Sequence, residues 1–357
     1  MLQALAPTRR PGPLFPRLLG DVGGTHARFA WQSHEGAAIE HVEVLPCAQY
    51  PSLADAVQAY LRRHSQRNLQ GRPACAALGI ATPVLGDWLA MTNHPWAFSA
   101  RALRAELGLE RLLVLNDFTA LALALPELDE QAKRQIGGGS PVSGANIALL
   151  GPGTGLGVSG LVRDASAGLF VPIAGEGGHV TLAAGNALEF AVIEMLQARY
   201  GHVSAERVLS GAGLVNLYGA LAQIRGLALE PLTPAQIMQR AMEPDASAGG
   251  AGAAAGGHCD AMALETLDLF CGFLGQVAGD LALTLGARGG VYIGGGIVPR
   301  MGRRFEQSPF RARFEAKGRY SAYLQSIPVW LIDSPMPVAL LGAAQALALP
   351  ESMLTTV

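Results

Sequence analysis

Short apolar segments alternate along the chain with segments in which apolar residues recur every three or four positions. The short segments predict β-strands within residues 18–32, 42–45, 75–81, 112–115, 146–162, 290–293 and 327–332. The periodic segments predict helices at residues 52–63, 99–107 and 117–126, from Thr233 onward, at 261–287 (one long or two short), and at 338–349. A run rich in Ala, Gly and Ser over residues 243–257 predicts a mobile surface loop. Strands that alternate with helices indicate an α/β layer architecture.

Two segments share one pattern. Residues 18–30 read LLGDVGGTHARFA, and residues 146–162 read NIALLGPGTGLGVSGLV. In both, Leu-Leu-Gly precedes small residues with a Thr, and an apolar strand follows. The repetition predicts two similar halves, each opening with a β-hairpin whose tight turn faces the same cleft. The turn at Gly23-Gly24 is expected to need positive φ angles, which glycine adopts most readily.

Composition narrows the class of protein. The chain has 357 residues, of which 50% are apolar and 15% charged, so it is not intrinsically disordered. Its net charge of −2 lacks the basic excess of a nucleic-acid-binding protein, which favours a small-molecule partner.

The sequence favours a soluble protein without a membrane partner. The most apolar stretch, residues 267–287, contains Asp268, Gln276 and Asp280, which favours a buried helix over a membrane span. Residues 1–17 lack an apolar core of signal-peptide length and are expected to form a disordered tail. The four cysteines have no CxxC spacing, which predicts a reduced, cytosolic protein without disulfides or zinc.

Two glycine turns are candidates for phosphate binding. The chain has no Walker A motif and no kinase-type lysine context, so backbone amides and a metal ion would have to contact a nucleotide. Gly23-Gly24-Thr25 and Gly153-Thr154-Gly155 each offer close amides and a hydroxyl donor. Asp21 could hold Mg²⁺ through water, whereas Pro152 stands at the comparable place in the second half. Taken singly, either turn is more simply an ordinary hairpin, but their repetition favours phosphate binding.

A buried apolar strand ends abruptly at Asn116-Asp117. Ligands bind beyond the carboxyl ends of strands in α/β sheets, and an Asp there can take a proton from a hydroxyl that attacks a phosphoryl group. Asp117 could equally be a simple N-cap of the following helix. Local sequence leaves both interpretations open.

Further polar residues lie among glycines. Glu176 and His179 stand three positions apart in GEGGH, where glycines allow both side chains to converge on one ligand. Carboxylates such as Glu206 bind vicinal sugar hydroxyls well, and a missing hydroxyl leaves buried polar groups unpaired. Taken alone, Glu206 is more often a surface residue and His179 a structural one.

Seven segments, taken in order, closely resemble the bacterial glucokinase family of the hexokinase–actin superfamily. They are LLGDVGGTHARFA, GDWLAMTNHPWAFS, LNDFTA, GPGTGLGV, GEGGHV, HVSAERVLSGAGLVNLY and GGVYIGGGIVPR. The resemblance covers residues 18–349. It implies that Asp117 is the catalytic base and that glucose is held by Asn116, Asp117, Glu176, His179 and Glu206. It also implies that ATP and its Mg²⁺ lie against Asp21, Gly23, Gly24, Thr25, Gly153, Thr154, Gly155, Gly294, Gly295 and Gly296, with the metal at Asp21.

The resemblance implies a two-domain hexokinase/actin-like (ribonuclease H-like) α/β fold with duplicated β-sheet cores around a cleft. A small α/β domain is expected at residues 18–127 plus 337–357, and a large α/β domain at 128–336. Family members are cytoplasmic and commonly homodimeric. No cysteine closely follows Gly178-His179, so the structural zinc of the related repressor/kinase group is not expected. No helix-turn-helix segment is recognised before residue 18, which disfavours a DNA-binding repressor.

The expected activity is ATP-dependent phosphorylation of D-glucose at the 6-hydroxyl, the first step of glycolysis. Alternatives are a kinase for another hexose, a catalytically silent sugar sensor, or an actin-like ATPase that uses no sugar. ADP or polyphosphate as the phosphoryl donor also stays open.

Overall fold

The computed structural model of the chain describes residues 14–65, 71–242, 260–350 and 354. They form two compact units, each built around one β-sheet with its own hydrophobic core. The first unit comprises the residues up to Leu128, Phe170–Ala174 and the residues from Pro335 onward. The second unit comprises Asp129–Leu169 and Gly175–Ser334.

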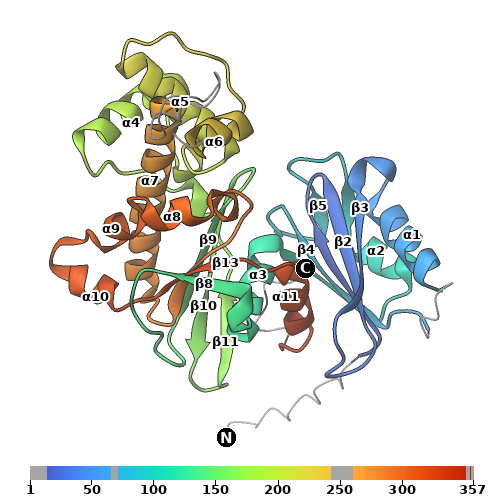
Figure 1. Ribbon diagram of the computed structural model, residues 1–357. Coiled ribbons are helices and arrows are strands. Elements are labelled where there is room, and N and C mark those ends of the chain that lie inside the picture. Colours follow the sequence, from blue (N-terminus) through green and yellow to red (C-terminus); the bar gives the residue numbers. More distant parts are fainter. Residues whose placement is uncertain (1–13, 66–70, 243–259, 351–353, 355–357) are drawn as a thin grey trace, which may run out of the picture. The chain divides into compact units, whose positions relative to one another are not determined.

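The sheet of the first unit has five strands in the order β3-β2-β1-β4-β7 (Figure 1). They are β1 (Arg17–Val22), β2 (His26–Gln32), β3 (Glu40–Pro46), β4 (Cys75–Ile80) and β7 (Arg111–Asn116). Strands β1 to β3 are antiparallel, and β1, β4 and β7 run parallel. Strand β4 is buried at every position, because helices cover both faces of the parallel part. A separate hairpin joins β5 (Trp88–Ala90) to β6 (Ala97–Ser99).

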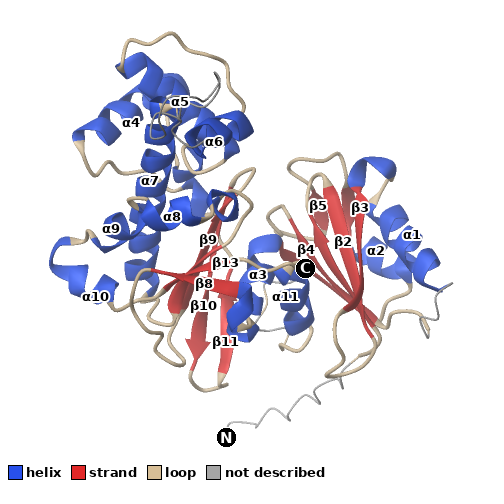
Figure 2. Ribbon diagram, in the orientation of Figure 1, coloured by secondary structure: helices blue, strands red, loops and turns tan. Residues whose placement is uncertain are grey.

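Four helices cover this sheet (Figure 2). Helices α1 (Leu53–Ser65) and α2 (Ala100–Leu107) share one core cluster with the sheet, and α3 (Asp117–Ala124) packs with α11 (Val338–Ala346) on the other face. The helix starts expected at Ser52 and Ser99 are confirmed. Ser52 Oγ accepts the Asp55 amide at 3.1 Å, Ser99 caps α2, and Gly108, with a φ of 66°, ends α2.

The sheet of the second unit has the order β11-β10-β9-β12-β13-β8. Its strands are β8 (Lys133–Ile136), β9 (Ile147–Pro152), β10 (Leu156–Asp164), β11 (Leu169–Ile173), β12 (Gly290–Ile293) and β13 (Val329–Ile332). Strands β9 and β10 form an antiparallel hairpin, β9, β12 and β13 run parallel, and β8 adds an antiparallel edge.

The predicted duplication is confirmed by the two strand orders. In each sheet an antiparallel hairpin, β1-β2 or β9-β10, continues into two parallel strands on the side of its first strand. The duplicated α/β cores are those of the hexokinase/actin-like fold expected from the sequence. One local prediction is wrong: neither Gly23 nor Gly24 has a positive φ.

The helices of the second unit surround its longest member. They are α4 (Ala187–Tyr200), α5 (Gly211–Ile224), α6 (Pro234–Met242), α7 (Ala261–Leu285), α8 (Arg303–Gln307), α9 (Phe310–Glu315) and α10 (Ser321–Gln325). The helix start expected at Thr233 is confirmed, and it has a capping box. The Gln236 amide donates to Thr233 Oγ1 at 3.3 Å, and the Thr233 amide donates to Gln236 Oε1 at 2.9 Å.

Short 3₁₀ helices connect the main elements. They are η1 (Cys47–Gln49), η2 (Leu125–Glu127), η3 (Glu130–Ala132), η4 (Gly177–His179), η5 (Ala205–Arg207), η7 (Val298–Met301) and η8 (Gly318–Tyr320).

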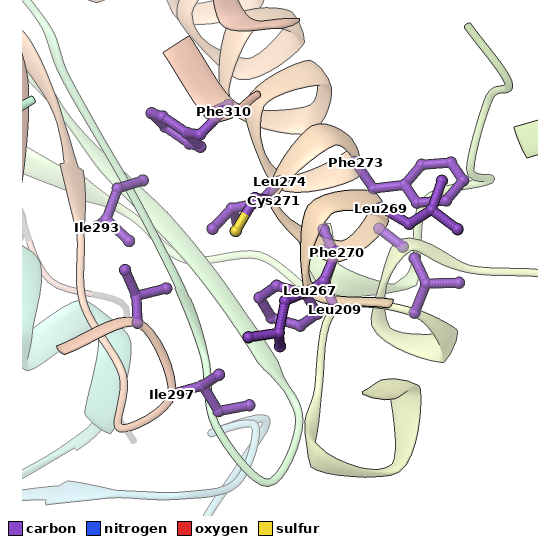
Figure 3. Packing of buried hydrophobic residues seen from close by; sticks show 14 of the residues in the cluster. Leu209, Leu267, Leu269, Phe270, Cys271, Phe273, Leu274, Ile293, Ile297 and Phe310 are labelled. Atoms are coloured by element: carbon purple, nitrogen blue, oxygen red, sulfur yellow. The ribbon is translucent and has the colours of Figure 1, made fainter. Parts of the chain in front are cut away.

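Helix α7 is one continuous helix of 25 residues, so the two-helix alternative is wrong. The helix is long enough for a membrane span, and an 18-residue stretch of it has a mean hydropathy of 1.3. However, 67% of that stretch is buried inside the protein. Figure 3 shows its side chains packed with Ile293 of β12 and Phe310 of α9. Helix α7 is thus the central core helix of the second unit.

Two sequence predictions fall on residues that the structure does not describe. They are residues 1–13 of the expected tail and the expected surface loop at residues 243–257. Arg17, the last residue of the expected tail, begins β1. Of the four cysteines, Cys47, Cys75 and Cys271 are buried free thiols, and Cys259 lies outside the described residues.

Candidate active site

Polar residues of the first unit gather at the carboxyl ends of its parallel strands. Asp21 of β1 lies opposite Gly79 of β4, and Asn116 of β7 lies opposite Ile80. Ligands of α/β sheets bind at this edge, where chain turns leave amides and side chains uncovered. The register therefore brings Asp21 and the Asn116-Asp117 pair, which are far apart in the sequence, to one edge of the sheet.

Asn116 is the residue that caps helix α3. Its Oδ1 accepts the amides of Phe118 and Thr119 at 2.9 and 3.2 Å. Its Nδ2 donates to the Thr82 carbonyl at 3.4 Å, which leaves one Nδ2 hydrogen for a ligand. Asp117 is the first residue of the helix, so the interpretation of Asp117 as the N-cap is wrong. The Phe118 amide also donates to Asp117 Oδ1 at 2.9 Å, so this carboxylate contributes to the first turn without being its cap.

The charges around Asp117 suit a proton acceptor. Burial raises the pKa of Asp117 to about 6, and the negative charge of Asp21 adds to this rise. Burial also raises the pKa of Asp21, but the Arg28 guanidinium, 3.1 Å from Asp21 Oδ2, opposes that rise. Arg28 lies directly across the hairpin from Asp21. A base whose pKa lies near the working pH combines a useful ionised fraction with strong proton affinity.

The turn between β1 and β2 is shaped by a segment that packs against it. The Gly23 amide donates to the His26 carbonyl at 3.0 Å and closes the hairpin. The amides of Gly24 and Thr25 are therefore the better candidates for phosphate donors. A Cβ on Gly24 would lie 2.9 Å from the backbone oxygen of Asn93. Gly24 is required by this close approach of two backbones and not by its φ angle.

One cavity of the first unit lies away from this edge. It has a volume of about 370 Å³ and is lined by residues of α1 and α2 near the amino ends of β4 and β7. A cavity of about 30 Å³, enough for one water molecule, lies beside Asn116. Its lining residues are Val84, Leu115, Asn116, Thr119, Pro172 and Ala174. The carboxylates, rather than cavity size, therefore locate the candidate site.

In the second unit, Glu206 contacts the glycine turn between β9 and β10. The Leu156 amide donates to Glu206 Oε2 at 2.9 Å. A Cβ on Gly155 would lie 2.4 Å from the same oxygen, so glycine leaves the space that this carboxylate uses. The Gly211 amide donates to the Gly153 carbonyl at 2.9 Å. The start of α5 and the preceding η5 thus hold the turn at two points.

The residues of the GEGGH segment share one tight turn. Glu176 and His179 flank the glycines of η4 with exposed side chains, and the His179 amide donates to the Glu176 carbonyl at 3.0 Å. Residues 180–182 then pair with residues 203–205, which lead into Glu206. Glu176, His179 and Glu206 are thereby carried by two adjoining segments of the second unit.

The glycines after β12 lie against the end of β9. The Gly294 amide donates to the Leu150 carbonyl at 2.9 Å. Gly295 has a φ of 79°, and a Cβ on it would lie 2.3 Å from the Pro152 carbonyl oxygen. Gly294, Gly295 and Gly296 therefore adjoin the turn that starts at Gly153.

The donor set for a metal ion is sparse. Among the residues that the structure describes, no group of three or more His, Cys, Asp or Glu side chains could hold a metal ion. Asp21 fits Mg²⁺, which commonly keeps several waters and takes one or two carboxylates plus substrate phosphates. Arg28 occupies Asp21 Oδ2, so the other oxygen would face the hydrated ion.

The predicted site residues fall into two groups, one on each unit. The first unit holds Asp21, Gly23, Gly24, Thr25, Asn116 and Asp117, and the second holds Gly153, Thr154, Gly155, Glu176, His179, Glu206, Gly294, Gly295 and Gly296. The sequence interpretation missed Arg28 and Asn93. The hairpin pattern could have placed Arg28 opposite Asp21, whereas no local signal indicates the contact of Asn93 with Gly24.

Comparisons with known proteins agree with one another. The sequence matches the family model described as Glucokinase over residues 18–350. It is 54% identical to a glucokinase of Aromatoleum aromaticum over 93% of this chain and 95% of that protein. It is 52% identical to a glucokinase of Chromobacterium violaceum over 94% of this chain and 90% of that protein.

Solved structures give the same result. A glucokinase from an Antarctic psychrotroph matches with a TM-score of 0.80 and 37% identity, over 93% of this chain and 98% of that chain. A glucokinase of the ROK family from Streptomyces griseus, solved with glucose and AMPPNP, matches with a TM-score of 0.58 and 18% identity, over 93% and 99% of the two chains. The second likeness shows the fold alone.

Proposed function

Because the chain belongs to the glucokinase family, we propose that it transfers the γ-phosphoryl group of ATP to the 6-hydroxyl of D-glucose. The observation that carries this proposal is the Asp117 carboxyl at the carboxyl edge of the first sheet, with its pKa raised to about 6. A kinase of this kind needs a base that is largely ionised near neutral pH and is not tied up by a salt bridge.

Asp117 acts as the general base. It accepts the proton of the 6-hydroxyl while that oxygen attacks the γ-phosphorus in line, and ADP leaves with the electrons of the broken phosphate bond. Asn116 fixes the carboxylate indirectly, because it caps α3 at the residue before Asp117. Positioning and electrostatic stabilisation supply most of the rate in phosphoryl transfer.

The hydroxyls of glucose are held by Asn116, Glu176, His179 and Glu206. Asn116 offers its remaining amide hydrogen, and the two carboxylates accept from vicinal hydroxyls. Glu206 already accepts the Leu156 amide through Oε2, so Oε1 is the oxygen assigned to the sugar. Asn116 and Glu206 thus each have one specific atom for the substrate.

ATP is bound by the two glycine turns. In the first unit the amides of Gly24 and Thr25 contact phosphate oxygens, and in the second unit those of Thr154 and Gly155 do so. Gly294, Gly295 and Gly296 lie against the adenosine. Asp21 would hold Mg²⁺ through water, and the ion would neutralise charge on the phosphate oxygens. Arg28 keeps Asp21 oriented for this task.

The cellular setting follows from the same family. We assign the enzyme to the cytoplasm as a homodimer that carries out the first step of glycolysis. The first unit corresponds to the small domain and the second unit to the large domain of the family.

A coupled assay of glucose 6-phosphate formation tests the proposal. Purified protein is supplied with glucose and ATP, ADP or polyphosphate in parallel, and initial rates are compared across glucose, mannose, fructose and an amino sugar. Turnover that requires both ATP and glucose supports the proposal. A higher kcat/KM for another hexose would reassign the acceptor, and ATP hydrolysis that sugar does not stimulate would indicate an ATPase. Glucose binding without turnover would indicate a sensor.

A further inference from the structure

A buried polar network contacts residues 180–186, the segment that follows His179. It consists of Glu189 of α4, Gln276 of α7 and Arg313 of α9, and it is called here the brace. Glu189 is 2% exposed and Gln276 is 8% exposed. A buried carboxylate is tolerated when it is paired and hydrogen-bonded. Glu189 therefore needs the partners described next in order to stay buried.

Arg313 joins the other two members of the brace. Its Nη2 donates to Glu189 Oε2 at 2.8 Å and to Gln276 Oε1 at 2.6 Å. One guanidinium nitrogen therefore fixes a side chain from each of two helices. The fit is close, because a Cβ on Gly185 would lie 2.0 Å from this nitrogen.

The brace holds the backbone of residues 180–186. Gln276 Nε2 donates to the Ala183 carbonyl at 2.7 Å, and the Gly185 amide donates to Glu189 Oε2 at 2.6 Å. These residues have no helix or strand of their own beyond one isolated bridge. Their position therefore depends on these contacts.

The same segment adjoins the proposed sugar residues His179 and Glu206. His179 immediately precedes it, and the Ala205 amide donates to the Val180 carbonyl at 2.9 Å. The Leu182 amide donates to the Val203 carbonyl at 3.0 Å. A shift of residues 180–186 would consequently move both His179 and the strand-like segment that ends at Glu206.

We propose that Arg313, acting through Gln276 and Glu189, is a positioning residue for glucose recognition by Glu176, His179 and Glu206. This inference rests on the proposed function. The side-chain hydrogen bonds of Arg313 are to Glu189 and Gln276, and neither residue belongs to the proposed nucleotide turns. Removing Arg313 should therefore act on sugar binding and leave ATP binding nearly unchanged. A misplacement of about 1 Å at a binding residue can cost up to about 100-fold in rate or affinity.

The test compares Arg313→Ala and Gln276→Glu with Arg304→Ala. The Glu variant keeps an oxygen acceptor for Arg313 but has no donor for the Ala183 carbonyl. Arg304 is the matched control, because its Nη2 pairs with Asp268 at 2.9 Å between α8 and α7 without contacting residues 180–186. Initial rates give KM for glucose and for ATP separately, calorimetry gives the glucose Kd, and thermal unfolding shows that each variant is folded.

We expect Arg313→Ala to raise the glucose KM about 10- to 100-fold and Gln276→Glu about 3- to 10-fold. The ATP KM should change by less than about twofold in both, and Arg304→Ala should leave both constants near the parent values. Folded brace variants with a parental glucose KM, or with equal rises in both constants, would overturn the inference. If Arg313→Ala does not fold, Gln276→Glu decides by the same criterion. A parent protein that neither binds nor phosphorylates glucose would overturn the proposed function itself.

Discussion

The hairpin turns at the ends of β1 and β9 share one backbone arrangement but differ in the carboxylate that lies beside them. Each follows a Leu-Leu-Gly strand and precedes an antiparallel strand, and in each the first glycine amide bonds within the turn. The first turn has a carboxylate of its own, Asp21, paired with Arg28. The second has Pro152 at that place and takes its carboxylate, Glu206, from a distant segment.

The difference shows how one duplicated scaffold can divide the work of a reaction. In the first unit, the negative charge of Asp21 acts on Asp117. Together with burial, it raises the pKa of Asp117 to about 6. In the second unit, the Leu156 amide anchors Glu206 through Oε2, and Oε1 is the oxygen proposed for the sugar. The first arrangement suits proton transfer beside a metal-bound phosphate, and the second suits recognition of hydroxyls.

Removing the carboxylate of Asp117 should have the largest effect on activity. Asp117→Asn keeps the shape of the side chain but cannot accept the hydroxyl proton, so we expect kcat to fall about 10²- to 10⁴-fold. The glucose Kd, measured by calorimetry, should change far less. Glu206→Gln is the counterpart in the second unit and should mainly raise the glucose KM. An Asp117→Asn enzyme with near-normal kcat would remove Asp117 from the role of base.

Alanine substitutions at the turn glycines should distinguish a close contact with backbone, at Gly24, from a close contact with a side chain, at Gly155. Gly24→Ala meets the backbone of Asn93 and should lower stability by about 1–3 kcal/mol, seen as a lower Tm. Gly23→Ala is the control, because its Cβ would lie 3.5 Å from the nearest atom. Gly155→Ala meets the end of the Glu206 side chain, which can move, and should raise the glucose KM with a smaller change in Tm. Equal Tm losses for Gly23→Ala and Gly24→Ala would contradict the steric account.

The pH dependence of kcat/KM should follow the ionisation of Asp117 in the first unit. The raised pKa of Asp117 means that its inactive, protonated form persists up to about pH 6. We therefore expect kcat/KM for glucose to be constant above this pH and to fall about tenfold per pH unit below it. Initial rates at saturating ATP between pH 4.5 and pH 8, in buffers of about constant ionic strength, measure this limb. An acid limb near pH 4 would show that the group in control lacks the buried environment of Asp117.

The two threonine hydroxyls should give the smallest effects. Thr25→Val and Thr154→Val each remove one exposed donor from a turn. The loss of one hydrogen bond should raise the ATP KM about 2- to 10-fold, with little change in the glucose KM. A difference between the two variants would show which turn contacts the transferred phosphate more closely. Unchanged ATP KM values in both would exclude the hydroxyls as phosphate donors.

Much of the fold could be predicted because its signals are local. Apolar segments marked every strand of the first sheet and four of the six strands of the second, but missed β8 and β11. Ser52, Ser99 and Thr233 marked helix starts. Local signals failed where two interpretations differ by one residue. Asn116 and Asp117 are both good caps, and only the backbone path from β7 into α3 decides that Asn116 takes the role.

The candidate site was predicted in its residues but not in its contacts. The sequence led to Gly24 through an expected positive φ, whereas the physical reason is the carbonyl of Asn93. Glu206 was indicated as a sugar ligand, yet nothing nearby in sequence reveals its bond to Leu156. Such contacts join residues that are remote along the chain, so no local pattern carries them.

The amino-acid sequence by itself therefore determined the repeated strand-turn-strand plan and the family, and it indicated the candidate residues for the chemistry. Periodicity, turn glycines and long motifs are properties of neighbouring residues, and they can be recognised without coordinates. Only the tertiary structure decided that Asn93 lies against Gly24, that Asp117 has a raised pKa and that Arg313 braces the segment after His179. Ionisation and close packing depend on burial and on distances between remote segments, and both exist only once the chain has folded.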